Sequence, residues 1–192
     1  MYPFIYTTGI STNLLNAVYA PQKKDYWCWS ASITMILNAY GIQNVSQTSF
    51  ARDVCGIDEY GRACNCGATD LDISRSLNLN GRDQHGRQFQ VKAPLYTSTP
   101  SLTRIFNELE NQRPVLVAYR YAGMPMKHAV IITGAEYHIQ NNTKYISKLI
   151  IRDPDPDIWN QMNDGRKEIT DVTGFLNSVK AHWYIHINKT PL

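Results

Sequence analysis

Apolar side chains recur at helical spacing in the first third of the chain. A helix over residues 27–40 is predicted from apolar residues three or four positions apart, namely Ile33, Ile36, Leu37 and Tyr40. Gly41 then supplies a stop signal. Two further helices are predicted at 47–54 and at 69–79, and the second carries acidic residues in its first turn. The first third is therefore expected to be helical.

Beyond residue 88 the pattern changes to that of strands. Five short runs rich in β-branched and aromatic residues predict strands at 89–93, 115–121, 128–137, 145–153 and 183–187. Helices are predicted between them at 102–109 and at 172–177. Residues 1–20 alternate weakly, so we expect at most a short strand there, ending near Tyr19.

Helices first and strands afterwards favour an α+β fold with an antiparallel sheet. No regular alternation of strand and helix demands a parallel sheet. We expect a single domain over 1–192, because 192 residues with 43% hydrophobic content suit one core. The helical half would cover about 20–80 and the sheet half about 88–190, with the first long helix facing the sheet across a cleft.

Charge and hydropathy exclude several classes of function. The net charge of +3 comes from 19 basic and 16 acidic residues spread along the chain without a Lys/Arg block, so nucleic-acid and membrane binding are not indicated. No apolar run approaches the ~18 residues of a membrane span. The first twenty residues lack a basic segment leading into an apolar stretch, so a secretory signal is expected to be absent or already removed.

Cys28 is the first candidate for catalysis, because it stands at the start of the predicted helix 27–40. Unpaired N–H groups and the helix dipole stabilise a thiolate at such a position. Gln22, six residues earlier, could donate to a developing oxyanion together with the Cys28 N–H. The alternative is that Cys28 is a small buried core residue, as most buried cysteines are.

His128 is the best candidate for a base, because it is the first residue of an apolar strand. A hairpin centred between residues 140 and 141 would pair it with Asp153, and a shift of the turn by one residue would pair it with Asp155. Either carboxylate could hold the imidazole in one tautomer and orient it toward a thiol. The alternative is a structural histidine beside a turn-forming Asp-Pro-Asp-Pro.

The other three cysteines fall within a loop rich in Gly, Asp and Asn. A disulfide could join Cys55 to Cys64 or to Cys66, and reduced thiols are equally permitted. A zinc site is the sharper alternative. It would need His85 as a fourth ligand, and the spacing matches no standard zinc pattern.

Several of these segments occur together in a familiar order. The motifs are Gln22, Trp27-Cys28-Trp29-Ser30-Ala31-Ser32, Arg113-Pro114-Val115, Lys127-His128-Ala129-Val130 and Arg152-Asp153-Pro154. In this order the chain resembles the bacterial papain-like cysteine peptidases over about residues 18 to 188. The nearest group is the branch that includes type III effector proteases of plant pathogens.

The resemblance implies a papain-like fold and a site without metal or cofactor. It implies Cys28 as nucleophile, His128 as general base and acid, Asp153 as the orienting carboxylate and Gln22 in the oxyanion hole. One departure is Lys127, where relatives often have a glycine before the histidine, so access to the imidazole could be restricted.

The resemblance also bears on substrate and location. It implies a protein or peptide substrate and secretion from a bacterium, with delivery into a target cell as the effector variant. Trp27 and Trp29 could line a substrate groove, although packing explains aromatic residues beside a helix start equally well. No prodomain is apparent, so an activating or inhibitory protein partner stays open.

Two other classes of function use the same residues. One is a different thiol acyl-transfer enzyme: an amidase, a deamidase, a transglutaminase or a peptidoglycan-cleaving toxin. The other is a catalytically silent binding module, in which Cys28 and His128 would lie too far apart to react.

Overall fold

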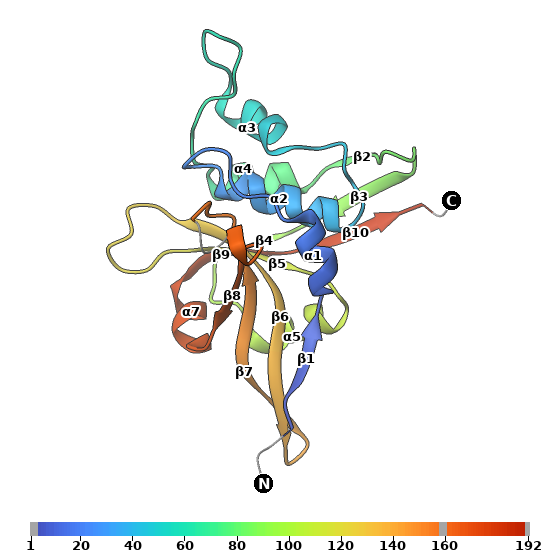
Figure 1. Cartoon of the computed structure of the whole chain (residues 1–192), viewed down its shortest axis with the longest axis vertical. Coiled ribbons are helices and arrows are strands. Elements are labelled where there is room, and N and C mark those ends of the chain that lie inside the picture. Colours follow the sequence, from blue (N-terminus) through green and yellow to red (C-terminus); the bar gives the residue numbers. More distant parts are fainter. Residues whose placement is uncertain (1–3, 158–160, 191–192) are drawn as a thin grey trace.

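A long antiparallel sheet carries most of the second half of the chain in the computed structural model, which describes residues 4–157 and 161–190 (Figure 1). Its strands run in the order β4 (Leu95–Tyr96), β9 (Val179–Tyr184), β5 (Val115–Tyr119), β6 (His128–Gln140), β7 (Thr143–Arg152) and β8 (Arg166–Ile169). β1 (Tyr6–Gly9) pairs with the outer part of β6. A second sheet of three strands contains β10 (His186–Lys189), β3 (Gln88–Lys92) and β2 (Asn80–Arg82).

The helices lie on both faces of the long sheet. In chain order they are α1 (Thr12–Val18), α2 (Cys28–Ala39), α3 (Gln47–Cys55), α4 (Asp70–Leu77), α5 (Leu102–Glu110) and α7 (Val172–Ser178). Figure 1 shows α2, α3 and α4 together at one end of the molecule, with the β6–β7 hairpin extending away from them. Helices before the sheet and antiparallel strands within it confirm the predicted α+β fold.

The core explains why β6 begins as an unbroken apolar run. Ala129 and Ile131 face the helix α2, where Trp29 and Ile33 are buried. Val130 and Ile132 alternate with them on β6 and belong to a second cluster on the opposite face, under α5 and α7. That cluster also contains Ile105, Leu109, Phe175 and Leu176. A strand covered on both faces needs apolar residues at every position. The start of β6 is therefore rigidly held, and His128 is its first residue.

The first twenty residues differ from the prediction of one weak strand ending near Tyr19. The strand β1 ends at Gly9, and a helix follows it. Gly9 has φ of +131° and lies against Thr133, where an added Cβ would be 2.3 Å from the carbonyl oxygen. This pairing with a strand more than a hundred residues away leaves no local pattern, so alternation alone could not locate it.

The β6–β7 turn also differs from the predicted register. Asn141 and Asn142 form the turn with φ of 48° and 62°, and Gln140 pairs with Thr143. Two residues in the left-handed region are typical of a tight hairpin turn that suits twisted strands. The turn is thus centred between residues 141 and 142, and the predicted centre between 140 and 141 is wrong.

Candidate active site

The helix α2 positions Cys28 at its first residue, against the start of β6. The helix is buried along most of its length, from Trp29 to Leu37. Ser32 Oγ donates a hydrogen bond to the Ala129 carbonyl at 3.2 Å, and the Ala129 N–H donates to Cys28 Sγ at 3.5 Å. These contacts hold the thiol beside the strand that carries His128.

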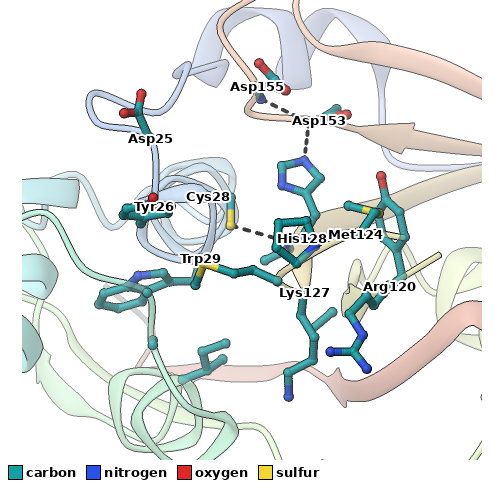
Figure 2. Close-up of a pocket in the computed structure, with 18 of the residues that line it drawn as sticks. Asp25, Tyr26, Cys28, Trp29, Arg120, Met124, Lys127, His128, Asp153 and Asp155 are labelled. Carbon is teal, nitrogen blue, oxygen red and sulfur yellow. Dashed lines mark hydrogen bonds and ion pairs between the residues drawn. The ribbon is translucent and has the colours of Figure 1, made fainter. Parts of the chain in front are cut away.

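His128 lies beside Cys28 in the same pocket, on β6 and not on α2 (Figure 2). Its ring packs edge-on against Tyr119, with 5.7 Å between ring centroids, and its side chain is 17% exposed. Nε2 lies 2.7 Å from Asp153 Oδ1, and the imidazole lines the same cavity as the Cys28 thiol. Since Nε2 faces the carboxylate, Nδ1 is the nitrogen left for the thiol.

Asp153 reaches the imidazole from outside the β6–β7 ladder. The ladder ends where Ile131 pairs with Arg152, and the Asp153 N–H then donates to the Gly165 carbonyl at 2.8 Å. Continued pairing in this register would have set Asp155 opposite His128. Instead Asp155 donates its backbone N–H to Asp153 Oδ1 at 3.0 Å, and the Asp153 side chain makes the contact with the imidazole.

The pKa values of His128 and Asp153 are shifted in opposite directions. Burial alone would lower the pKa of His128, but the hydrogen bonds and charges of Asp153 and Cys28 outweigh it and raise this pKa to about 10. Burial would raise the pKa of Asp153, whereas His128 and Lys167 bring it down to about 2. The imidazole is therefore held protonated and the carboxylate ionised at neutral pH.

A cavity of about 570 Å³ opens over these groups. Cys28 and His128 line it together with Trp29, Tyr119, Met126 and Lys167. Along one side, Lys127 forms an ion pair with Asp70 at the start of α4, so its side chain is drawn toward the helical half. A thiol beside an imidazole that is hydrogen-bonded to a carboxylate, in an open cavity, can perform nucleophilic acyl transfer.

Comparisons with known proteins agree with this chemistry. The family model described as Peptidase_C39 like family matches residues 14–184. The chain belongs to this family. A search of curated protein sequences finds no match. The Peptidase_C39-like assignment places the chain among papain-like cysteine peptidases.

The solved structures that are similar to the chain include the following two. One is the peptidase domain of Streptococcus ComA, a bifunctional ABC transporter involved in quorum sensing; it is 18% identical with a TM-score of 0.50, and the match covers 90% of this chain and 97% of that domain. The other is digestive procathepsin L 3 of the Tenebrio molitor larval midgut, at 11% identity and a TM-score of 0.48, covering 93% of this chain and 69% of that one. At such identities the likeness to ComA shows a papain-like fold alone.

Gln22 of this Peptidase_C39-like chain lies next to the site but not in the lining of the cavity. Its Nε2 donates to the Asp25 carbonyl at 2.8 Å, and its backbone N–H donates to the Pro154 carbonyl at 2.7 Å. Its buried Oε1 has no hydrogen-bond partner among the described residues. The bond to Asp25 engages one of the two N–H groups of the amide, and the role of Gln22 toward an oxyanion stays a prediction.

The two tryptophans beside Cys28 have different surroundings. Trp29 lines the cavity, and its indole N–H donates to the Cys66 carbonyl at 3.4 Å. Trp27 is 2% exposed, packs against Ala51 and Ala63, and does not line the cavity. The prediction that Trp27 lines a substrate groove is therefore corrected, because its indole is buried against these residues.

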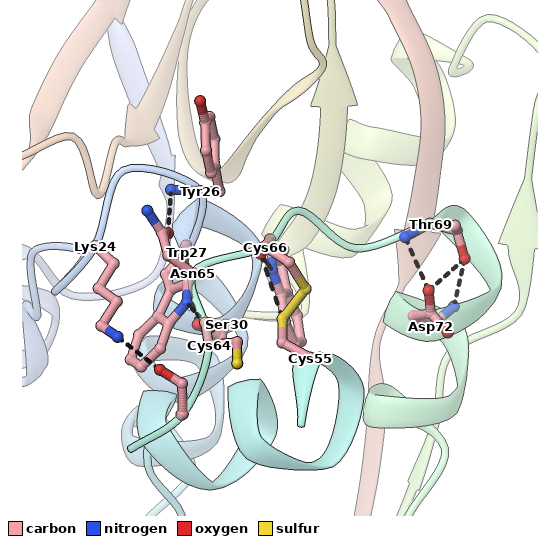
Figure 3. The surroundings of a disulfide bond; sticks show 12 residues. Lys24, Tyr26, Trp27, Ser30, Cys55, Cys64, Asn65, Cys66, Thr69 and Asp72 are labelled. Atoms are coloured by element: carbon pink, nitrogen blue, oxygen red, sulfur yellow. Dashed lines mark hydrogen bonds between the residues drawn. A yellow bond between two sulfur atoms is a disulfide. The ribbon is translucent and has the colours of Figure 1, made fainter. Parts of the chain in front are cut away.

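Cys55 and Cys66 form a disulfide, and Cys64 remains a free thiol (Figure 3). The zinc alternative is wrong, because two of its proposed ligands are bonded to each other. In residues 4–157 and 161–190 no cluster of three or more His, Cys, Asp or Glu side chains is arranged to hold a metal. The disulfide fixes the segment 64–68, which we call the strap, beside the helix α2.

Lys167 is a site residue that the sequence did not indicate. Its Nζ lies 2.8 Å from Asp153 Oδ2. It reaches this position through pairing of β8 with β7, and that strand pairing had no recognisable local pattern.

None of the helices in the described part of this Peptidase_C39-like chain has the length and apolar content to cross a bilayer.

Proposed function

We propose that the chain hydrolyses peptide bonds through Cys28, His128 and Asp153. The observation that carries this proposal is the convergence of Cys28 and His128 on one cavity, with His128 Nε2 held 2.7 Å from Asp153 Oδ1. The family match supports a cysteine peptidase, and the geometry supplies each group that the reaction needs.

The reaction starts from the ion pair in which His128 is an imidazolium, with the proton on Nδ1, and Cys28 is a thiolate. Cys28 Sγ attacks the substrate carbonyl carbon, and the carbonyl oxygen takes up the negative charge. The Cys28 backbone N–H, at the first position of α2 where helix N–H groups have no partner within the helix, would donate to that charge. Gln22 would add a second donor through the N–H of its amide that does not bond Asp25.

The imidazolium then protonates the departing amine, and the acyl group stays on Cys28 as a thioester. A water molecule gives up a proton to His128 and attacks the thioester. Collapse of this second intermediate releases the acid and restores the thiol. Asp153 holds the ring with Nδ1 toward Cys28 throughout and balances the imidazolium charge.

The test uses a peptide library whose products are identified by mass spectrometry. We expect internal peptide cleavage by the wild-type chain and by Cys64→Ser, and none by Cys28→Ala or His128→Ala. Products of side-chain deamidation or crosslinking alone would reassign the site to another thiol acyl transfer.

A second measurement needs no substrate. Cys28 and Cys64 are both partly exposed free thiols, so a difference in their alkylation reflects activation more than access. We expect iodoacetamide at neutral pH to label Cys28 well before Cys64. Equal labelling rates would count against an activated nucleophile.

We also propose that the protein works outside the bacterial cytoplasm. The Cys55–Cys66 disulfide supports this location, because disulfides persist mainly in oxidising compartments. Mass spectrometry of protein trapped with a thiol reagent from culture medium and cell lysate tests it, and a fully reduced cytoplasmic protein would overturn it. Membership of the plant-pathogen effector branch and delivery into a target cell rest only on the resemblance between sequences.

A further inference from the structure

Lys167 holds the far side of the Asp153 carboxylate. It lies in β8, and its Nζ is 2.8 Å from Oδ2, while His128 Nε2 is 2.7 Å from Oδ1. We propose that Lys167 is a positioning residue, which acts through Asp153 to fix the carboxylate and to limit the proton affinity of His128. This inference rests on the proposed function and extends it to a fourth side chain.

The first part of the argument concerns orientation. The Asp153 side chain is 4% exposed, and both of its oxygens are engaged. Oδ1 accepts from His128 and from the Asp155 N–H, whereas Lys167 is the donor to Oδ2. Without Lys167, a nearly buried oxygen would lose its charged donor, which is costly, and the carboxylate could turn away from the imidazole.

The second part concerns charge. One carboxylate stands between two cations, so the stabilisation that it offers is divided between the imidazolium and the ammonium. Lys167 helps to depress the pKa of Asp153, together with His128. The other titratable groups around the pair include Tyr19 after α1, Cys28 of α2, Tyr119 of β5, and Asp155 and Asp157 after β7.

The shared carboxylate decides in which direction Lys167 changes the proton affinity of His128. Removing the Lys167 charge leaves Asp153 paired with His128 alone, so the imidazolium is stabilised further. A more basic imidazole gives up its proton to the leaving amine less readily. Lys167 therefore keeps the acid form of His128 reactive.

The test compares variants of one position with a control on the neighbouring strand. Lys167→Met and Lys167→Gln remove the charge, and Lys167→Arg keeps it. Lys148 offers the control, because it has similar exposure and pairs with Glu136 and Glu168, 3.0 Å away, not with the site. Each variant is compared by kcat, KM, the pH profile of kcat/KM and histidine-selective NMR, with His128→Ala used to assign the resonance.

We expect Lys167→Met to move the His128 titration and the alkaline limb of kcat/KM upward by about one pH unit, the order expected for one nearby charge. It should lower kcat about tenfold with little change in KM. Lys167→Arg should restore both, and Lys148→Met should alter neither. If the Met variant does not fold, Lys167→Gln carries the same prediction.

Two results would overturn the inference. An unshifted His128 titration in a folded neutral variant would show that Lys167 does not act through Asp153. A raised KM with unchanged kcat and pH profile would make Lys167 a substrate contact. Because the NMR titration needs no substrate, an absence of peptide cleavage by the wild-type chain would reject the proposed function while leaving this electrostatic coupling measurable.

Discussion

Asp153 lies 2.7 Å from His128 Nε2 although the two residues are not paired in the β6–β7 ladder. The ladder stops at Arg152, one residue before Asp153. The Asp153 backbone N–H instead donates to the carbonyl of Gly165, just before β8. The carboxylate is therefore placed by the loop after β7 and by β8. Its position depends on contacts that a hairpin alone would not provide.

The pH dependence of stability follows from the two perturbed groups. His128 has a pKa raised from 6.5 to about 10 in the folded state, so its contribution is complete below about pH 6.5 and is lost as the pH rises through 10. Asp153 has a pKa lowered from 3.8 to about 2, so its contribution is present above pH 3.8 and is lost as the pH falls through 2.

We therefore expect the pair to stabilise the fold most between about pH 4 and 6.5. Urea denaturation of wild-type protein and His128→Ala at pH 5, 8 and 10.5 measures this. The difference in unfolding free energy between wild-type protein and His128→Ala should become steadily smaller as the pH rises. A difference that is constant with pH would contradict it.

Substitution of the two candidate carboxylates should separate their roles. Asp153→Ala is expected to lower kcat by about 10- to 100-fold, less than the complete loss in His128→Ala, because an orienting group is not itself a reactant. Asp155→Ala should change kcat less than threefold or so, since Asp155 contacts the site through a backbone N–H that the substitution keeps. Steady-state kinetics with one peptide decide between them, and the reverse order would exchange the assignments.

Gln22→Ala tests the second oxyanion donor. We expect kcat to fall by about 10²-fold with KM nearly unchanged, because the amide would meet charge that exists only in the transition state. The structure supplies a competing outcome, since the amide bonds the Asp25 carbonyl at 2.8 Å. A lower melting temperature with an unchanged kcat would assign Gln22 to holding that turn.

Removal of the disulfide should loosen the strap and destabilise the fold. The bond closes a loop between residues 11 positions apart, and loops of this size contribute on the order of 2–3 kcal/mol. Thermal unfolding of Cys55→Ser should show this loss. Cys64→Ser is the control because its sulfur is unpaired, and an equal loss in both variants would refute a role for loop closure.

Gly165→Ala should damage both stability and activity. Gly165 has φ of +70°, and a Cβ there would lie 2.4 Å from the Asp153 carbonyl oxygen and 2.4 Å from the Tyr19 ring. Gly86 has φ of +78° with open space around it in the described part of the chain, so Gly86→Ala carries the backbone strain alone.

We expect about 1–2 kcal/mol of destabilisation for Gly86→Ala and at least about 3 kcal/mol for Gly165→Ala. Only the second should also lower kcat, since it displaces the backbone of Asp153. Denaturant unfolding and peptide cleavage measure the two effects, and equal losses in both variants would show that the close approach matters little.

Local patterns were sufficient where a residue and its neighbours decide the structure. Apolar spacing located α2 and placed Cys28 at its start, and the apolar run located β6 with His128 first. The strands missed include β2, β4 and β8, with 3, 2 and 4 residues, because short edge strands are formed by their partners more than by their own side chains.

Long-range geometry could not be predicted in the same way. The sequence suggested two carboxylates for His128, and the pairing was settled by the connection from Asp153 to Gly165. The same limit explains Lys167, whose contact depends on β8, and Trp27, whose burial depends on the loop closed by the disulfide. One strand predicted at 183–187 is divided at Ile185 between two sheets for the same reason.

The interior place of β9 sets the order in which this molecule can mature during synthesis. β9 pairs with both β4 and β5, and β5 in turn pairs with the strand that carries His128. Cys28, His128 and Asp153 all precede Val179–Tyr184 in the chain and are therefore synthesised before it. A nascent chain thus contains its candidate catalytic residues while the middle of its sheet is still missing, so the sheet that supports them cannot be completed until β9 has been made.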